Sequence, residues 1–392
     1  MKPSSLLVFA DDWGRHPSSC QHLIRRLLDR RPTIWVNTIG MRPPRFDLLT
    51  LKRGLGKIRQ WLRPAHSHPG ADAPGSPAGP RVLNPRMWPW LRSPFDRRLN
   101  RMLLLRQLTP VLESLPAPPI AVTTLPIVAD LMGRLPVQRW VYYCVDDFAE
   151  WPGLDRRPLQ RMEAEVIARA DRIVAVSESL QERICRLGRS ADLLTHGVDL
   201  DFWVNASTQD AFPELASLER PLILFWGVID RRMDADFLRR LAADLDWGTV
   251  VLVGPENNPD PALRRIPRLV QLPAQPFERL PALAREAAVL IMPYADLPVT
   301  RAMQPLKLKE YLATGKPVVV RDLPAAREWA DCLDLCTSPA AFSAAVRARL
   351  RDGLPAAQRL ARGRLAEESW DEKARTFERL VLETIPDAVA CC

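Results

Sequence analysis

The stretch PLKLKEYLATGKPVVV, residues 305–320, predicts a short helix that leads directly into a buried strand. Pro305 suits the first turn of a helix because its missing N–H group is not needed there. Gly315 stands where helices commonly end, so the helix is expected over Pro305–Thr314. The apolar run Pro317–Val320 is typical of a buried strand. A helix followed directly by such a strand is the repeating unit of a parallel α/β sheet.

The same stretch holds three of the chain's seven lysines, although arginine supplies most of the positive charge elsewhere. Lys307 and Glu310 share one face of the predicted helix at a spacing of i, i+3. Lys309 lies off that face, and Lys316 follows the end of the helix. Of the three lysines, only Lys307 therefore has the placement expected of a ligand-binding residue.

Short apolar segments alternate with helical patterns in two rounds along the chain. This alternation predicts parallel sheets with crossover helices. We therefore expect an α/β protein of two doubly wound, Rossmann-like domains that face each other across a cleft. The expected parts are an N-terminal domain (1–198) with a Pro-rich surface loop near 64–90, a C-terminal domain (199–365), and a C-terminal helix and tail (366–392) that packs back on the first domain.

Composition narrows the class of protein. A hydrophobic content of 47% and a charged content of 26% are those of a soluble globular chain, and no apolar run is long enough to span a bilayer. No signal peptide is indicated, because the N-terminal apolar run Leu6–Ala10 is short and two aspartates follow it at once. No zinc site is indicated either, because the seven cysteines form no CxxC pair. The net charge of +9 fits an anionic partner. The basic segments 52–63 and 86–106 also carry Trp, Leu and Met, so they predict either a membrane-surface contact or ordinary amphipathic helices.

In doubly wound sheets, ligands bind beyond the carboxyl ends of the strands. There, the N-terminus of the Pro305 helix could bind a diphosphate through free N–H groups, with Lys307 adding a point charge. Glu310, one turn later, could accept hydrogen bonds from the two hydroxyls of a ribose. The alternative is a Lys307–Glu310 pair on the protein surface that serves only the helix.

Three further loops follow predicted strands. The loop DDWGRHPSS begins at Asp11, and Asp146-Asp147 follows WVYYCV; both offer carboxylates for a base or for sugar hydroxyls, and both could equally be helix caps. In GVIDRRMD, Gly227 lets the backbone pass close to a ligand, and Arg231 or Arg232 could reach a phosphate.

The ordered set of motifs resembles GT-B glycosyltransferases, nearest to the family 4 type. The second half carries RIVAVSESL, HGVD, FWGVIDRR, VVLVGP, FERLPALAREAAVLIMPY and PLKLKEYLATGKPVVV. In the first half, DDWGRHPSSCQHL and VYYCVDDF are similar to a bacterial subset that acts in exopolysaccharide or teichuronic-acid-type assembly. The resemblance covers nearly the whole chain and implies a nucleotide-diphosphate sugar as the donor. It also implies that 1–198 is the acceptor-side domain and 199–365 the nucleotide-sugar-binding domain.

The resemblance also implies roles for single residues. Glu310 matches the second Glu of the family's E-x7-E motif, which contacts the ribose, whereas Met303 stands in place of the first Glu. Asp146 and Asp147 lie where family members often have a His-Asp pair beside the reacting sugar. An aspartate at this strand end is the base in some inverting GT-B enzymes, whereas family 4 enzymes are retaining, so both stereochemical outcomes stay open. The predicted catalytic residues are Asp146, Asp147, Asp12 and His16, and the predicted substrate-binding residues are Gly227, Arg231, Arg232, Pro255, Tyr294, Met303, Lys307 and Glu310.

These observations predict a hexosyltransferase-type enzyme that moves a sugar onto a glycan or lipid-linked hydroxyl acceptor in cell-surface polysaccharide biosynthesis. We expect it to need no metal and no cofactor, and to be cytoplasmic with a peripheral contact to the inner membrane face. A nucleotide-sugar 2-epimerase on the same fold is one alternative. A non-catalytic basic binding module is another, although no nucleic-acid motif is present and no nucleic-acid partner is expected.

Overall fold

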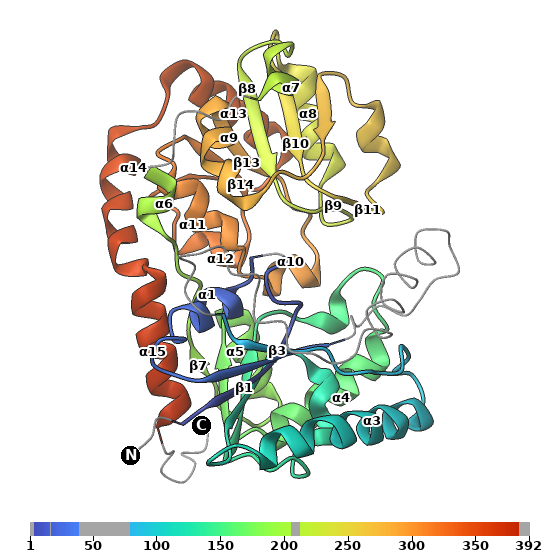
Figure 1. Ribbon diagram of the computed structural model, residues 1–392. Coiled ribbons are helices and arrows are strands. Elements are labelled where there is room, and N and C mark those ends of the chain that lie inside the picture. Colours follow the sequence, from blue (N-terminus) through green and yellow to red (C-terminus); the bar gives the residue numbers. More distant parts are fainter. Residues whose placement is uncertain (1–3, 16, 39–78, 205–211, 384–392) are drawn as a thin grey trace. The chain divides into compact units, whose positions relative to one another are not determined.

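The computed structural model describes residues 4–15, 17–38, 79–204 and 212–383. The chain divides into two compact units, one formed by 1–195 together with 373–392 and the other by 196–372 (Figure 1). The second unit is thus an insertion in the first. The basic segment 52–63 and most of the Pro-rich stretch lie outside the described residues.

Unit 1 is built on a parallel sheet whose described strands follow the order β3-β2-β1-β4-β5-β6-β7. The direction of winding reverses between β1 and β4, which is the topological switch point of a doubly wound sheet. The strands are β1 (Leu6–Ala10), β2 (Thr33–Asn37), β3 (Arg81–Leu83), β4 (Ile120–Thr123), β5 (Arg139–Cys144), β6 (Arg172–Ala175) and β7 (Asp192–Leu193). The helices are α1 (Ser19–Arg25), α3 (Pro94–Glu113), α4 (Arg156–Arg169), α5 (Glu178–Arg186) and most of α15 (Trp370–Leu382), with 3₁₀ turns at Pro126–Leu131 and Phe148–Glu150.

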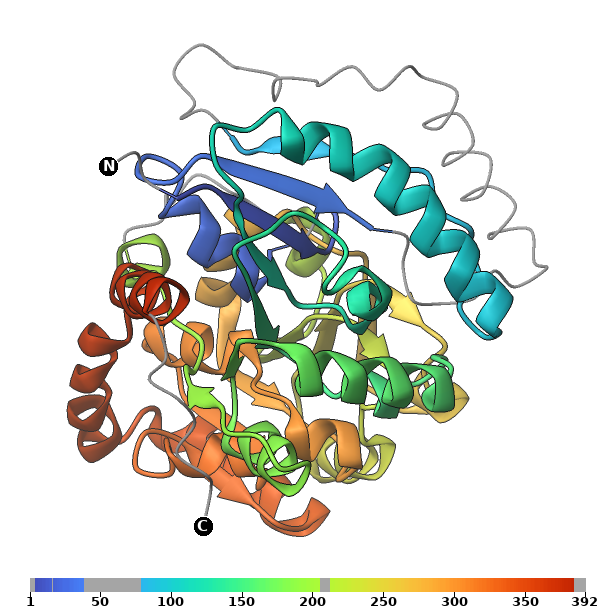
Figure 2. The same cartoon turned by 90° about the horizontal axis from the view of Figure 1, so that it is seen from below.

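Two neighbouring tyrosines of β5 show how helices cover both faces of this sheet. Successive side chains of a strand point to opposite faces. The Tyr142 hydroxyl donates to Glu163 of α4 at 2.7 Å, whereas the Tyr143 ring lies 5.3 Å from the Phe377 ring of α15. Helix α4 therefore covers one face and α15 the other, and Figure 2 shows α15, in red, on the opposite side of the sheet from α3 and α4.

Helix α15 brings the end of the chain back to unit 1. Its Glu378 accepts from Arg31 at 2.8 Å in the turn before β2. Just before this helix, Val198 and Ser369 form a parallel bridge, with the Val198 N–H donating to the Glu368 carbonyl at 2.8 Å. The entry and exit segments of unit 2 are therefore hydrogen-bonded to each other.

Unit 2 repeats the same winding. Its described main sheet is parallel with the order β12-β10-β8-β13-β14-β15, so its switch point lies between β8 and β13. The strands are β8 (Leu222–Trp226), β10 (Thr249–Val253), β12 (Leu269–Leu272), β13 (Ala287–Met292), β14 (Val318–Arg321) and β15 (Asp334–Cys336). Strands β8 and β10 are buried along their whole length, as their continuous apolar sequences LILFW and TVVLV require.

A second, two-stranded sheet and short helices surround that core. The small parallel sheet pairs β9 (Ile229–Asp230) with β11 (Glu256–Asn257). The helices are α6 (Leu200–Val204), α7 (Pro213–Ala216), α8 (Ala235–Asp244), α9 (Leu280–Glu286), α10 (Pro298–Ala302), α11 (Leu306–Ala313), α12 (Pro324–Arg327), α13 (Pro339–Asp352) and α14 (Ala356–Ala361), with 3₁₀ turns at Pro261–Arg265, Phe277–Arg279 and Arg362–Glu368.

The structure corrects several predicted bounds. Helix α11 begins at Leu306, and Pro305 is its N-cap rather than its first residue. Within the predicted Pro-rich surface loop, Arg81–Leu83 forms the edge strand β3. In the basic segment 86–106, the helix begins only at Pro94, because Ser93 and Asp96 form a capping box there.

Candidate functional site

The predicted donor-site residues of unit 2 gather at its switch point. Gly227 directly follows β8, and Tyr294 lies just beyond the adjacent strand β13. The two loops are joined by backbone hydrogen bonds, from the Ala295 N–H to the Arg232 carbonyl at 2.7 Å and from the Asp234 N–H to the Pro293 carbonyl at 2.9 Å. The sheet topology and these bonds together fix the position of Tyr294 relative to Gly227.

Lys307, in the first turn of α11, is the cation of this site. Its Nζ donates to the Tyr294 hydroxyl at 2.7 Å and lies 4.8 Å from the centre of the Phe225 ring. Gly227 provides the space for it, because a Cβ there would lie 2.9 Å from Lys307 Cε. Gly227 also has φ +138°, a conformation that favours glycine.

A second glycine packs behind the first. Gly254 follows β10 with φ +154°, and a Cβ at this position would lie 2.7 Å from the Gly227 carbonyl carbon. The next residue, the exposed Pro255, accepts from the Ile229 N–H at 3.0 Å. Pro255 therefore shapes the loop through its backbone carbonyl, while the close approach depends on Gly254, which the sequence prediction did not include.

Glu310 lies one turn beyond Lys307 on the same helix. Burial raises the pKa of its carboxyl to about 7, and the Lys307 charge and the Trp226 indole only partly oppose that rise. At neutral pH the carboxyl is therefore divided between its protonated and ionised forms, so it can both donate to and accept from a hydroxyl. The Lys307 and Glu310 side chains are both only partly exposed, so the surface pair considered as the alternative would not be fully solvated.

The two arginines of the GVIDRRMD loop differ sharply. Arg231 is exposed, whereas Arg232 is buried and holds Asp230 through its Nε at 3.0 and 3.1 Å and its Nη2 at 2.9 Å. The Arg232 Nη1 also lies 3.5 Å from Met303 Sδ. Met303 thus contacts a buried guanidinium, and Asp230 neutralises the charge that Arg232 would otherwise offer to a phosphate.

Lys309 has a different role from Lys307, although only one residue separates them. It is 1% exposed, pairs with Glu368, and donates to the His196 carbonyl at 2.6 Å. It lies 5.5 Å from the centre of the Trp329 ring. Lys309 therefore connects α11 to the segments where the chain enters and leaves unit 2.

In unit 1, the loop after β1 is organised by Asp11. Its carboxylate accepts from Ser18 at 3.0 Å and from Gln21 at 2.7 Å, and burial raises its pKa. Asp12, the predicted catalytic residue, instead pairs with Arg15 at 3.1 Å near the surface. The predicted His16 lies outside the described residues.

Asp147, after β5, is the most buried of the predicted catalytic carboxylates. It is 9% exposed, and its Oδ2 lies 3.6 Å from Arg183 Nε of α5. Its Oδ1 has no hydrogen-bond partner in the described part of the chain. Arg183 also pairs with the buried Glu163, so nearby carboxylates raise the pKa of this guanidinium. Asp146 is half-buried beside Asp147.

Arg183 and Glu163 were missed by sequence reasoning. Each lies within an ordinary helical pattern, and the two are separated by a strand, so no local motif connects them to Asp147. The same holds for Asp11, which was noted as the start of a loop but not as its organising carboxylate. In the described ranges, His, Cys, Asp and Glu side chains form no group of three or more that could hold a metal ion. No helix within those ranges is long and apolar enough to cross a bilayer.

Comparison with known proteins agrees with this architecture. Residues 220–352 match the family model described as Glycosyl transferases group 1. TuaH of Bacillus subtilis (strain 168), named for glycosyl transfer in teichuronic acid biosynthesis, is 32% identical over 180 residues, which is 43% of this chain and 45% of TuaH. The match thus spans less than half of the length of that curated relative.

The solved structures match over nearly the full length. Sucrose-phosphate synthase of Thermosynechococcus elongatus has a TM-score of 0.67 at 15% identity and covers 96% of this chain and 98% of its own. HepE of Anabaena, solved with UDP and glucose, has a TM-score of 0.63 at 13% identity with the same coverages. The chain therefore has the GT-B fold of two Rossmann-like units. Within unit 2, residues 220–352 are similar to the glycosyl transferases group 1 family.

Proposed function

We propose that this protein transfers a sugar from a nucleotide-diphosphate sugar to a hydroxyl acceptor. The observation that carries the proposal is the Lys307 ammonium, held 2.7 Å from the Tyr294 hydroxyl in the space left by Gly227, at the switch point of unit 2. Among the similar structures, HepE was solved with UDP and an Escherichia coli trehalose-6-phosphate protein with UDP-2-fluoro glucose. A uridine diphosphate sugar is accordingly the first donor to test.

The donor diphosphate would bind at the start of α11. The N-cap Pro305 has no side chain that could cap the helix, so N–H groups of the first turn remain for an anion. Negative charge grows on the leaving nucleoside diphosphate as the sugar departs, and Lys307 stands where it would stabilise that charge. Glu310 would accept from the ribose hydroxyls in its ionised form.

The acceptor hydroxyl would be activated from unit 1. Asp147 is the favoured base because its Oδ1 is buried without a partner, while Arg183 faces the other oxygen. Asp146 stays a candidate beside it, and Asp12 a candidate for binding the acceptor. The proposal includes no metal ion, and transfer that survives treatment with a chelator would support it.

We further propose a glycan or lipid-linked acceptor in cell-surface polysaccharide assembly, with the protein resting on the inner membrane face. Support comes from the exposed side of α3, where Phe95 is 68% and Met102 is 47% exposed and Arg98 lies between them. Apolar and cationic groups on one helix face suit an anionic bilayer surface. Loss of sedimentation with anionic vesicles in Phe95→Ser/Met102→Ser is expected, and unchanged sedimentation would contradict this attachment.

The donor site is tested by calorimetry with UDP and other nucleoside diphosphates. Lys307→Ala and Glu310→Ala should each weaken the best-binding nucleotide by about tenfold or more, because each removes a hydrogen bond to a charged group. Asp147→Asn should leave this affinity intact while abolishing transfer to acceptor. Wild-type nucleotide affinity in both unit 2 variants would refute the site.

A further inference from the structure

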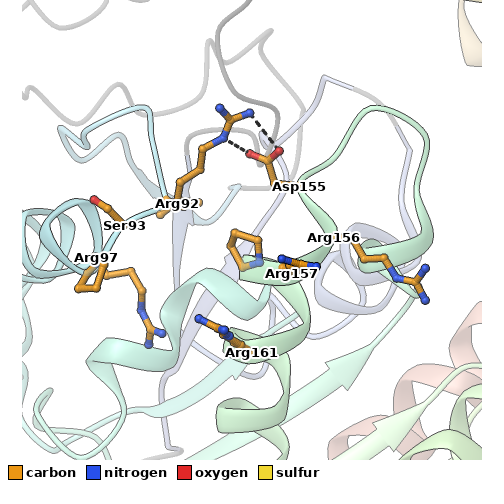
Figure 3. A pocket seen from close by; sticks show the side chains of 10 residues that line it. Arg92, Ser93, Arg97, Asp155, Arg156, Arg157 and Arg161 are labelled. Atoms are coloured by element: carbon orange, nitrogen blue, oxygen red, sulfur yellow. Dashed lines mark hydrogen bonds and ion pairs between the residues drawn. The ribbon is translucent and has the colours of Figure 1, made fainter.

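Unit 1 contains a cavity that takes no part in the function proposed above. It has a volume of about 570 Å³ and lies where α3 and α4 begin. Its lining is dominated by arginine side chains, drawn in Figure 3: Arg92, Arg97, Arg156, Arg157 and Arg161. Five guanidinium groups around one cavity are unusual enough to require an account of the partner of each.

Three of the five already have carboxylate partners. Arg97 donates to both carboxylate oxygens of Asp130 and of Glu165, at 2.6–3.0 Å. Arg92 binds Asp155 through two nitrogens at 2.5 and 3.0 Å. Arg156 forms an ion pair with Glu150 at 2.5 Å. In Figure 3 the Arg156 side chain points away from the other four.

Arg157 and Arg161 are the other two arginines that line the cavity. Within the described part of the chain, neither has an ion pair or a side-chain hydrogen bond, and both are exposed. They stand four residues apart on α4, so their like charges face each other and repel. An anion placed between them would relieve that repulsion and could receive bidentate bonds from both guanidinium groups.

The start of α4 adds to the positive potential of the cavity. Asp155 occupies the N-cap position, but its side chain makes no capping bond because Arg92 holds both of its oxygens. The α3 helix, in contrast, is closed by its own Ser93–Asp96 capping box. The cavity therefore combines two unpaired arginines with a helix start that no side chain caps.

We propose that this cavity binds a phosphate-ester or diphosphate group through Arg157 and Arg161. It goes beyond the proposed function, since it lies in unit 1 and involves none of the donor-site residues. The same phosphate chemistry could come from a soluble phosphorylated molecule or from a lipid headgroup at the membrane surface. The two sources differ in whether the ligand reaches the cavity free or as part of a bilayer.

The test compares two double variants of the full-length protein. Arg157→Ala/Arg161→Ala removes the proposed ligands, whereas Arg134→Ala/Arg186→Ala removes two exposed arginines of unit 1 that do not line the cavity. Inorganic pyrophosphate is titrated into each by calorimetry at low ionic strength, in a Lys307→Ala background that weakens binding at the donor site and is shared by both variants. We expect about a tenfold or greater loss of affinity in the cavity variant alone.

A second arm uses vesicles of phosphatidylcholine with and without phosphatidic acid. Cavity-dependent binding of pyrophosphate supports the site with a soluble ligand, and cavity-dependent sedimentation with phosphatidic acid vesicles supports it with a lipid headgroup. Equal behaviour of the two double variants in both arms overturns the proposal, as does the absence of binding to either probe. Loss of nucleotide binding in Lys307→Ala bears only on the donor site, so the two proposals fail separately.

Discussion

Gly227 and Lys307 pack against each other although they lie 80 positions apart in the sequence. The glycine offers no side chain, and any side chain there would occupy the place of the lysine. The Lys307 ammonium is the cation of α11 that lies at the switch point, since Lys309 is buried in an ion pair. Ligand binding at this site therefore depends on an absent side chain as much as on a present one.

Gly227→Ala should weaken nucleoside diphosphate binding by about tenfold or more, because the new methyl group displaces Lys307 and the φ of +138° is strained for alanine. The matched control is Gly353→Ala in the same unit, where φ is +69° and nothing lies within 4 Å of the added Cβ. That variant should lose about 1 kcal/mol of stability and no affinity. Calorimetry and urea unfolding separate the two effects, and equal nucleotide affinities in both variants would contradict the pairing.

Glu310 predicts a pH dependence of stability. Its pKa is raised from 4.5 to about 7 in the folded protein, so the folded state binds more protons than the unfolded state between those values. Its contribution is therefore fully present below pH 4.5 and is lost as the pH rises through 7. Relative to Glu310→Gln, the wild type should lose roughly 2–3 kcal/mol of unfolding free energy between pH 4.5 and 8. Urea unfolding of both proteins across this range gives the difference, and parallel profiles would rule out the buried carboxyl.

At the scale of elements, α11 serves two sites with alternate residues. Lys307 faces the switch point, whereas Lys309 holds Glu368 and the His196 carbonyl, which belong to the segments joining the two units. Helix α5 has a similar double contact, because its Arg183 pairs with Asp147 and with Glu163 of α4. In α11 the buried Lys309 anchors the helix that carries Lys307, and in α5 Arg183 holds Asp147.

Lys309→Met should destabilise the protein by about 3 kcal/mol, because the half-buried Glu368 carboxylate and the His196 carbonyl lose this buried cation. The second variant, Lys309→Met/Glu368→Gln, should recover part of this loss since the charge of Glu368 is removed as well. Lys316→Met is the matched control from the same stretch. Among the described residues the Lys316 ammonium hydrogen-bonds the Arg285 carbonyl at the surface, so its loss should cost less than 1 kcal/mol. Thermal unfolding compares the three, and an equal cost at positions 309 and 316 would contradict the structural role of Lys309.

Local signals predicted the elements better than the contacts between them. Pro305 and Gly315 were enough to place α11 within a residue, and the apolar runs placed most strands of the two large sheets. The short strands β3 and β15 were missed because three residues carry no periodic pattern. The Lys309–Glu368 pair joins positions 59 residues apart, so only the folded chain brings it together. The sequence correctly placed Lys309 on a different face of the helix from Lys307, but it did not indicate that Glu368 is its partner.

At the scale of the whole molecule, each unit winds its sheet in the same order and has candidate residues in loops that follow its strands. In unit 1 these are the loops after β1 and β5, and in unit 2 the loops after β8 and β13, the two strands that flank the switch point. The two units are thus two copies of one arrangement that suits ligand placement beyond the strand ends. The proposed phosphate cavity of unit 1 includes none of these candidate residues and would be a third site.

The bridge between Val198 and Ser369 has a consequence for how this chain can be cut and rebuilt. Because the two ends of unit 2 are hydrogen-bonded neighbours, the unit is an insertion that begins and ends at one place in the chain's fold. A gene fragment that encodes 196–372 keeps the ion pair of Lys309 and every residue of the proposed donor site, whereas unit 1 without it needs only a short linker between positions 195 and 373. Under the function proposed above, exchange of such insertions between related chains would change the donor sugar and leave the sequence of unit 1 untouched.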